Sequence, residues 1–206
     1  GVETGAAFDA EVRRAARAEC AVPVEPVVRR RLWSPQLDGE TEINVVAASE
    51  LVAGKMLALL DRSAPRDLYD IARIAADPIR FAVSDEARAR RVFIAMSAVL
   101  NHPLTSYGES RIERIADEAV RATLHPLLRG DALPTVRDLM QSAMPLVSHW
   151  LNLSPAEREY TDRIQVGELR LELLFPDEPD MVERLSSHPA LLWKVDNARR
   201  HTSTRG

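Results

Sequence analysis

From Ser49 to the C-terminus, the sequence shows a nearly continuous helical pattern, which limits the fold to a mostly helical one. Ser49 is a suitable N-cap, with Glu50 favourable in the first turn that follows. Pro65 suits the first turn of a second helix, which the pair Asp77-Pro78 closes. We predict helices at about 49–62, 64–76, 84–101, 110–129, 133–151, 155–166 and 178–200, with a loop at "LLFPDEPD".

The residues before Ser49 have a different character. "FDAEVRRAARAEC" places apolar residues on one face of a helix. "AVPVEPVVRRRLW" is β-branched and alternating, but Pro23 and Pro26 restrict it to an edge or irregular strand. "SPQLDGE" is typical of a turn and "TEINVV" of a short strand. We therefore predict an α+β, mostly helical fold, with a small α/β segment over residues 1–48 and a helical domain over 49–206.

Composition narrows the possible function classes. The 206 residues are 46% hydrophobic, which supports a core, and the net charge of −4 leaves no global basic footprint for nucleic acid. The basic run "VRRRLW" indicates a solvated strand face more than a nucleic-acid contact. The single cysteine, Cys20, excludes an intrachain disulfide framework and a four-cysteine zinc site. None of the five histidines pair at helical spacing, so we expect no zinc site: His102, His125, His149, His188 and His201.

The sequence contains no membrane or export signal. No apolar run approaches the roughly 18 residues that span a bilayer. The N-terminus lacks the apolar segment of a signal peptide. We therefore expect a cytoplasmic protein without a membrane partner. The first residue, Gly1, is not methionine, which is consistent with a piece of a longer protein.

A cluster of charged residues surrounds Pro65 in "KMLALLDRSAPRDLYD". Lys55 and Arg62 are two helical turns apart and lie nearly on one face, while Asp67 and Asp70 share a face of the next helix. Two helices joined by a tight turn could bring these groups together. Lysine and arginine neutralise phosphates, and a carboxylate can hold magnesium or act as a base. The alternative is a surface ion-pair network that pins the two helices together.

The same stretch resembles the signature of a known family. "ELVAGKMLALLDRSAPRDLYDIARI" is similar to the Glu-x-x-x-x-Lys…Arg-x-x-x-Arg-Asp-x-x-Asp motif of the AbiEii/AbiGii-type nucleotidyltransferase toxins. The matching positions are Glu50, Lys55, Arg62, Arg66, Asp67 and Asp70. Near the C-terminus, "LSPAEREYTDRIQVGELRLELLFPD" and "HPALLWKVDN" resemble the usual ending of that family.

The resemblance carries expectations about fold and chemistry. It implies a nucleotidyltransferase α/β core, of which residues 1–48 would be a remnant, followed by a C-terminal helical bundle. It implies transfer of a nucleotide from an NTP, with Mg²⁺, to an acceptor that in some members is tRNA. It also implies a toxin with a cognate antitoxin protein.

By position, the resemblance gives roles to the residues of the cluster. Lys55 would contact the triphosphate, and Asp70 would be the active-site carboxylate. Arg62, Arg66 and Asp67 would bind the substrate or support the other two.

One part of the family pattern is not found. The family's first motif is Gly-Gly or Gly-Ser followed by Asp-x-Asp, and "ETGAAFDAE" lacks that context. Two-metal phosphoryl chemistry needs such carboxylates, so we expect this chain alone to be inactive. Glu25, in "VPVEPVV", is a candidate metal ligand, with a plain edge-strand glutamate as the alternative.

A second function class therefore stays open. The chain could be a non-catalytic helical module that docks a partner such as an antitoxin. Its tryptophans are relevant to this choice. We expect Trp150 and Trp193 in the core or an interface, with Trp193 largely buried as an anchor of the last helix.

Overall fold

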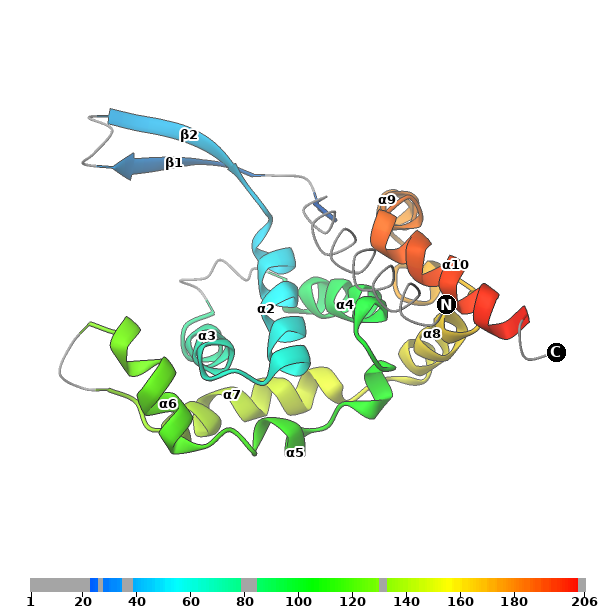
Figure 1. The fold of residues 1–206 in the computed structure, drawn as a ribbon. Helices are drawn as coiled ribbons and strands as arrows, with labels where there is room; N and C mark the ends of the chain where they lie inside the picture. Colours follow the sequence, from blue (N-terminus) through cyan, green and yellow to red (C-terminus); the bar gives the residue numbers. More distant parts are fainter. Residues whose placement is uncertain (1–22, 26–27, 35–38, 79–84, 130–132, 204–206) are drawn as a thin grey trace, which may run out of the picture.

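The computed structural model describes residues 23–25, 28–34, 39–78, 85–129 and 133–203 and shows a short β-ribbon followed by a helical body (Figure 1). The α-helices are α2 (Ala48–Arg62), α3 (Pro65–Ala76), α4 (Glu86–Met96), α5 (Glu109–Ile112), α6 (Asp117–Thr123), α7 (Val136–Leu151), α8 (Pro155–Gln165), α9 (Pro179–Ser186) and α10 (Pro189–Ser203). The predicted α+β, mostly helical fold is confirmed.

The ribbon consists of β1 (Val28–Ser34) and β2 (Gly39–Val45), which pair antiparallel and project from the helical body (Figure 1). The register runs from the pair Val28 and Val45 to the pair Ser34 and Gly39. The ribbon starts after both prolines of the sequence "AVPVEPVV", because proline cannot donate a ladder hydrogen bond. Both predicted strands are therefore present. The predicted helix at 8–20, with Cys20, lies outside the described residues.

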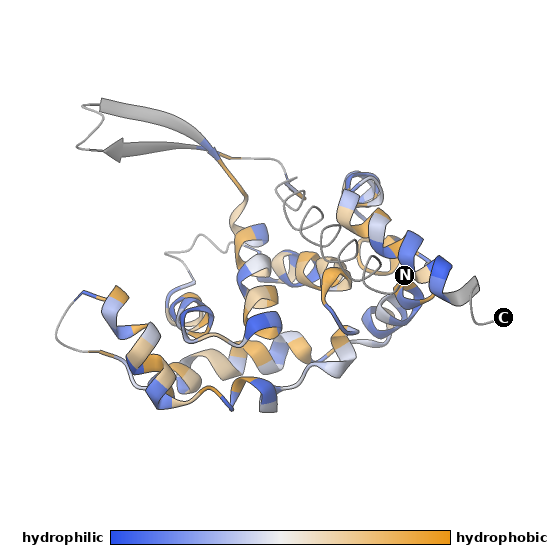
Figure 2. Ribbon diagram, viewed as in Figure 1, coloured by the Kyte–Doolittle hydropathy of each residue, from blue (hydrophilic) through white to orange (hydrophobic). Residues whose placement is uncertain are grey.

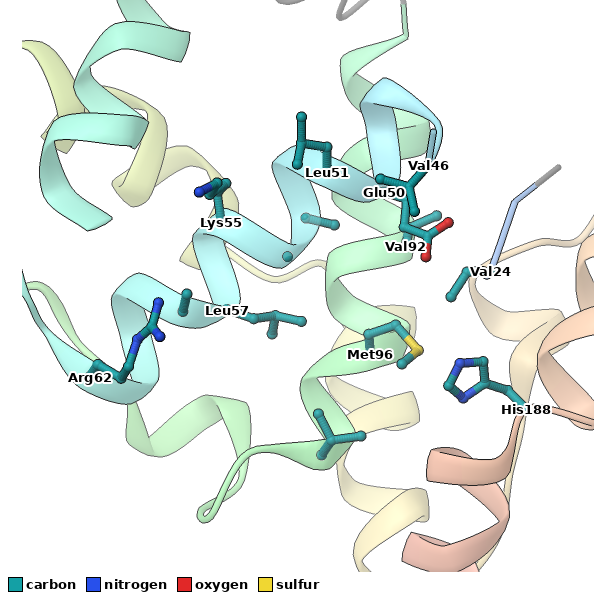
Figure 3. Close-up of a pocket in the computed structure, with 14 residues that line it drawn as sticks. Val24, Val46, Glu50, Leu51, Lys55, Leu57, Arg62, Val92, Met96 and His188 are labelled. Atoms are coloured by element: carbon teal, nitrogen blue, oxygen red, sulfur yellow. The ribbon is translucent and has the colours of Figure 1, made fainter. Parts of the chain in front are cut away.

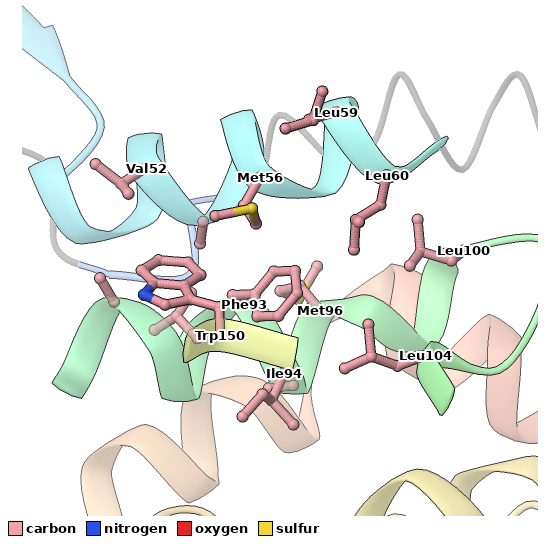
Figure 4. Close-up of a cluster of buried hydrophobic side chains, with 14 of the residues drawn as sticks. Val52, Met56, Leu59, Leu60, Phe93, Ile94, Met96, Leu100, Leu104 and Trp150 are labelled. Carbon is pink, nitrogen blue, oxygen red and sulfur yellow. The ribbon is translucent and has the colours of Figure 1, made fainter. Parts of the chain in front are cut away.

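The core lies where α2, α4 and α7 meet. Met56 and Leu60 from α2, Phe93 from α4 and Trp150 from α7 are fully buried (Figure 4). The centroids of the Phe93 and Trp150 rings lie 5.2 Å apart, which is within the range of favourable aromatic pairs. Trp150 Nε1 donates a hydrogen bond to a carboxylate oxygen of Glu86 at 3.2 Å. The expectation that Trp150 is a core residue is confirmed.

Hydropathy follows this packing. Figure 2 shows hydrophobic residues recurring along α2, α4 and α7, each of which also carries hydrophilic residues. Such amphipathic helices form because one stripe is buried while the opposite face stays hydrated. Among the described helices, none has both the length and the apolar character needed to cross a bilayer.

The start of α2 differs from the prediction. The N-cap position is Ala47, which makes no side-chain cap hydrogen bond, so Ser49 is not the N-cap. The hydroxyl of Ser49 instead donates a hydrogen bond to the carboxylate of Glu25. The first turn of α2 is thus fixed by a tertiary contact.

The predicted helix at 110–129 is divided in the structure. An extended turn at Ala116 separates α5 from α6, and a 3₁₀ turn (His125–Leu127) follows α6. The division leaves Ile112, Ile115 and Val120 all buried. Burial of these three side chains outweighs the local helical pattern. The predicted helix at 84–101 likewise ends early, at Met96.

The predicted helix at 178–200 is also divided, just before Pro189. α9 ends at Ser186 and α10 begins at Pro189, because proline lacks an N–H and clashes with the preceding turn. His188 Nδ1 accepts a hydrogen bond from the N–H of Ala190 at 3.3 Å and so satisfies a free donor at the start of α10.

Trp193 is partly buried, and its expected role as an anchor of the last helix stays a prediction. The buried residues of α10 are Ala190, Leu191, Val195 and Ala198. This spacing places the apolar stripe on a different face from residue 193, and Trp193 lies at its edge.

Candidate functional site

The charged cluster is assembled by the turn between α2 and α3. Ser63, after the last residue of α2, adopts a left-handed conformation with φ of 50°, and its N–H bonds to the carbonyl of Leu59 at 2.9 Å. Pro65 then occupies the first turn of α3, where its missing N–H costs nothing. The chain reverses within these few residues, so α3 packs against α2.

Lys55 and Asp70 meet across these two helices. Lys55 Nζ lies 2.7 Å from Asp70 Oδ2, and their side chains are 41% and 35% exposed. The pair joins the lysine motif to the second aspartate of the signature, as the sequence predicted. An ammonium has three donors, so Lys55 can hold Asp70 and still donate to another anion from the solvent side.

Arg62 and Asp67 form a second, tighter pair. Arg62 Nη2 and Nε donate to the two carboxylate oxygens of Asp67 at 2.7 and 3.1 Å. Asp67 is 2% exposed and Arg62 is 49% exposed. This bidentate geometry is the strong form of an ion pair. Asp67 is therefore a buried anchor for Arg62, whose guanidinium remains accessible from one side.

Arg66 is exposed and makes no ion pair with the part of the chain that the structure describes. The structure therefore brings four of the cluster's side chains into two cross-helix pairs and leaves this fifth one apart.

A cavity of about 400 Å³ runs along the exposed face of α2. Lys55 and Arg62 line one end of it and project from the same side of the helix (Figure 3). Val24, Met96 and His188 are grouped at the other end (Figure 3). The remaining lining residues are Val46, Glu50, Leu51, Ala53, Gly54, Leu57, Ala58, Val92 and Val99. Asp70 does not line this cavity. Of the groups that the sequence was expected to bring together, Lys55 and Arg62 share the cavity, and Asp70 is connected to it by its ion pair with Lys55.

Glu25 lies in a different environment from the strand that the sequence suggested. Its side chain is 8% exposed and accepts hydrogen bonds from Ser49 Oγ and, at 2.9 Å, from Arg88 Nε. Its N–H donates to a carboxylate oxygen of Glu50 at 3.0 Å. The carboxylate of Glu25 is therefore engaged by a hydroxyl and a guanidinium.

The described residues do not fit a magnesium ion by themselves. Among them, no three histidine, cysteine, aspartate or glutamate side chains gather closely enough to hold a metal. Asp67, Asp70 and Glu25 are each paired with a cation instead. The ligands for the Mg²⁺ that the resemblance implies would have to come from outside the described residues.

The partners of Glu25 could not be predicted from the sequence. Arg88 contacts both Glu25 and Glu178, and Arg91 contacts Glu178 at 2.7 Å. The two arginines are three residues apart on α4, a spacing that places them on one helix face and that "EARARRVF" already displays. Their acidic partners lie 63 and 87 or more residues away, so no local pattern could identify them.

The comparison with known families agrees with the resemblance. The family model described as nucleotidyl transferase AbiEii toxin, type IV toxin–antitoxin system, matches residues 5–142. The match spans well over half of the chain and includes the whole cluster around Pro65. The C-terminal resemblance lies beyond the matched residues and stays a prediction. No curated protein and no solved structure matches the chain. On the strength of the family match, this chain belongs to the AbiEii family of nucleotidyl transferase toxins of type IV toxin–antitoxin systems.

Proposed function

We propose that this chain carries the helical part of a nucleotidyltransferase site that transfers a nucleotide from an NTP to an acceptor, with tRNA as the candidate acceptor. The observation that carries the proposal is the contact between Lys55 Nζ and Asp70 Oδ2 at 2.7 Å. It joins the two halves of the family signature in a half-exposed position beside a cavity, where a substrate can reach the ammonium.

The chemistry assigns a role to each charged group. In nucleotidyl transfer an oxygen of the acceptor bonds to the α-phosphorus, the bond from that phosphorus to the bridging oxygen breaks, and pyrophosphate leaves. Negative charge grows on the leaving pyrophosphate, and a fixed cation stabilises it. Lys55 is the residue that we assign to the triphosphate. Asp70, as the active-site carboxylate, holds the ammonium in place.

Two arginines of the cluster support the same proposed function. Arg62 is held from behind by buried Asp67, so its guanidinium is oriented before any substrate arrives. Arg66 is exposed on the first turn of α3 and can meet phosphates of the NTP or of an RNA backbone. Both residues are substrate-binding candidates.

The coding sequence upstream of Gly1 gives the first test. A Gly-Gly or Gly-Ser turn followed by Asp-x-Asp, in frame, supports the enzyme. The longer protein should then incorporate labelled nucleotide into tRNA in the presence of Mg²⁺, and Lys55→Ala should lower the rate at least about a hundredfold. Incorporation that is unchanged in Lys55→Ala would refute the role of Lys55.

The alternative is a non-catalytic module that binds an antitoxin protein. One observation favours it: Asp67, Asp70 and Glu25 are already neutralised by cations, as in a structural network. Exposed Val46 and Leu51 at the rim of the cavity could contribute apolar contacts to such a partner. A start codon near residue 1, together with antitoxin binding that survives Lys55→Ala, would favour this alternative.

A further inference from the structure

Four charged residues connect distant parts of the chain around α4. Arg88 Nε donates to Glu25 at 2.9 Å, and Arg88 Nη1 donates to Glu178. Arg91 Nη2 donates to the other carboxylate oxygen of Glu178 at 2.7 Å. Two arginines and two glutamates thus form a charge-balanced network between the segment 23–25, α4 and the start of α9.

Glu25 connects this network to α2, the helix that carries Lys55. The carboxylate of Glu25 accepts from Ser49 Oγ, and its N–H donates to Glu50. Both contacts lie in the first turn of α2, where Ala47 provides no side-chain cap. Lys55 follows Glu50 by five residues, a rise of about 7.5 Å along the same helix. The start of α2 is therefore fixed by Glu25, and Glu25 is fixed by Arg88.

Arg88 occupies the centre of this network. Its guanidinium is a rigid fork, and two of its nitrogens are held by carboxylates on different elements. A shift of Glu178 would therefore pull the guanidinium away from Glu25. Arg91 restrains Glu178 from the other side and packs over the ring of Phe175, 5.8 Å from its centroid. Figure 1 places α9 and α10 at the end of the molecule away from α3.

We propose that this network is a positioning relay: the placement of α9 sets the start of α2, and thereby the position of Lys55, with Arg88 as the positioning residue. Glu178 makes no hydrogen bond or ion pair with α2 among the described residues, so the polar route from Glu178 to α2 runs through Arg88 and Glu25. The relay links α9 to the end of the cavity at which Lys55 and Arg62 lie. A role for it in nucleotide binding rests on the proposed function.

Native-state hydrogen exchange of the full chain tests the relay. Glu178→Gln removes the negative charge that both arginines contact and preserves the size of the side chain. We expect amide exchange in residues 48–54 of α2 to become at least about tenfold faster, in addition to faster exchange in α9. Arg88→Lys should produce a similar change in α2, because an ammonium cannot reproduce the fork. Both variants should be compared at temperatures well below their melting points.

A second arginine on the same helix provides the matched control. Arg90 forms an ion pair with Glu157 of α8. Both side chains of this pair are mostly buried, as in the Arg88 pairs, but neither belongs to α2. Arg90→Lys should accelerate exchange in α8 and leave residues 48–54 unchanged. If Glu178→Gln affects only α9, or if Arg90→Lys affects α2 equally, the relay does not exist and the contacts are local.

Nucleotide titration separates this inference from the proposed function. If the wild-type chain binds NTP, Glu178→Gln should weaken binding about three- to tenfold. If the wild-type chain binds no NTP, the proposed function fails, while the exchange result still decides the relay. If Glu178→Gln binds NTP as tightly as the wild type although exchange in α2 is faster, the relay does not control the position of Lys55.

Discussion

Asp67 and Asp70 lie one turn apart on α3, yet their surroundings give them different roles. Asp67 is almost completely buried and receives two hydrogen bonds from Arg62, whereas Asp70 is partly exposed and receives one from Lys55. A buried carboxylate depends on its partner, because an unpaired charge in the interior is costly. At the scale of residues, the Arg62–Asp67 pair stabilises the fold and the Lys55–Asp70 pair remains open to a ligand.

Removal of Arg62 should therefore cost more than removal of Arg66. We expect Arg62→Ala to lower the free energy of unfolding by about 1–3 kcal/mol, because it leaves Asp67 buried without its cation. Arg66→Ala should change it by no more than about 0.5 kcal/mol. Urea denaturation measures both. Equal losses for the two variants would contradict the difference in burial.

The stabilising contribution of Glu157 should be lost in acid. Burial raises the pKa of this carboxyl, but hydrogen bonds from Arg90 and from the Ser154 N–H outweigh that effect and hold the pKa below its usual 4.5. Because the folded-state pKa is the lower one, this stability is complete above about pH 4.5 and is lost as the pH falls through the folded value. Unfolding free energies between pH 3 and pH 7 should vary less in Glu157→Gln. The same pH slope in both proteins would contradict the assignment.

At the scale of elements, α2 and α3 could be predicted from the sequence almost to the residue. Pro65 and the polar residues around it encode the break locally, and the signature spacing encodes the Lys55–Asp70 contact. The division at Ala116 could not be predicted, because it depends on burial against helices distant in sequence. The same holds for Glu25, whose partner Arg88 is 63 residues away. Local patterns therefore predict α2, α3 and the Lys55–Asp70 pair. The division at Ala116 and the partner of Glu25 depend on contacts between residues that are distant in the sequence.

The two tryptophans of the helical body allow the effect of burial on stability to be compared. Trp150 is fully buried against Phe93, whereas Trp193 is partly buried and lies outside the buried stripe of α10. We expect Trp150→Ala to lower the free energy of unfolding by about 3–5 kcal/mol. Trp193→Ala should cost clearly less, about 1–2 kcal/mol, since part of this side chain is already exposed to water. Thermal denaturation of the two variants, monitored by circular dichroism, would contradict this order if Trp193→Ala has the lower melting temperature.

At the scale of the whole molecule, the helical body presents two cations at the end of a cavity. The family motif Asp-x-Asp does not occur in the sequence, and for this reason we expect this chain by itself not to transfer nucleotides. Incubation with labelled NTP, Mg²⁺ and tRNA should give no incorporation above that of Lys55→Ala. Robust labelling that depends on Lys55 would mean that metal ligands are present after all, with Glu25 as the first candidate.

If Lys55 belongs to a phosphate-binding site, this chain should bind nucleotides, and the binding should depend on Lys55. The chain has only one other lysine, Lys194, which is half-buried in α10 and serves as the matched control. Calorimetric titration with each NTP in the presence of Mg²⁺ should show binding to the wild type and to Lys194→Ala. Lys55→Ala should weaken that binding at least about tenfold, the loss expected for one charge-assisted contact. Equal affinity in Lys55→Ala and Lys194→Ala, or no binding by the wild type, would contradict the account.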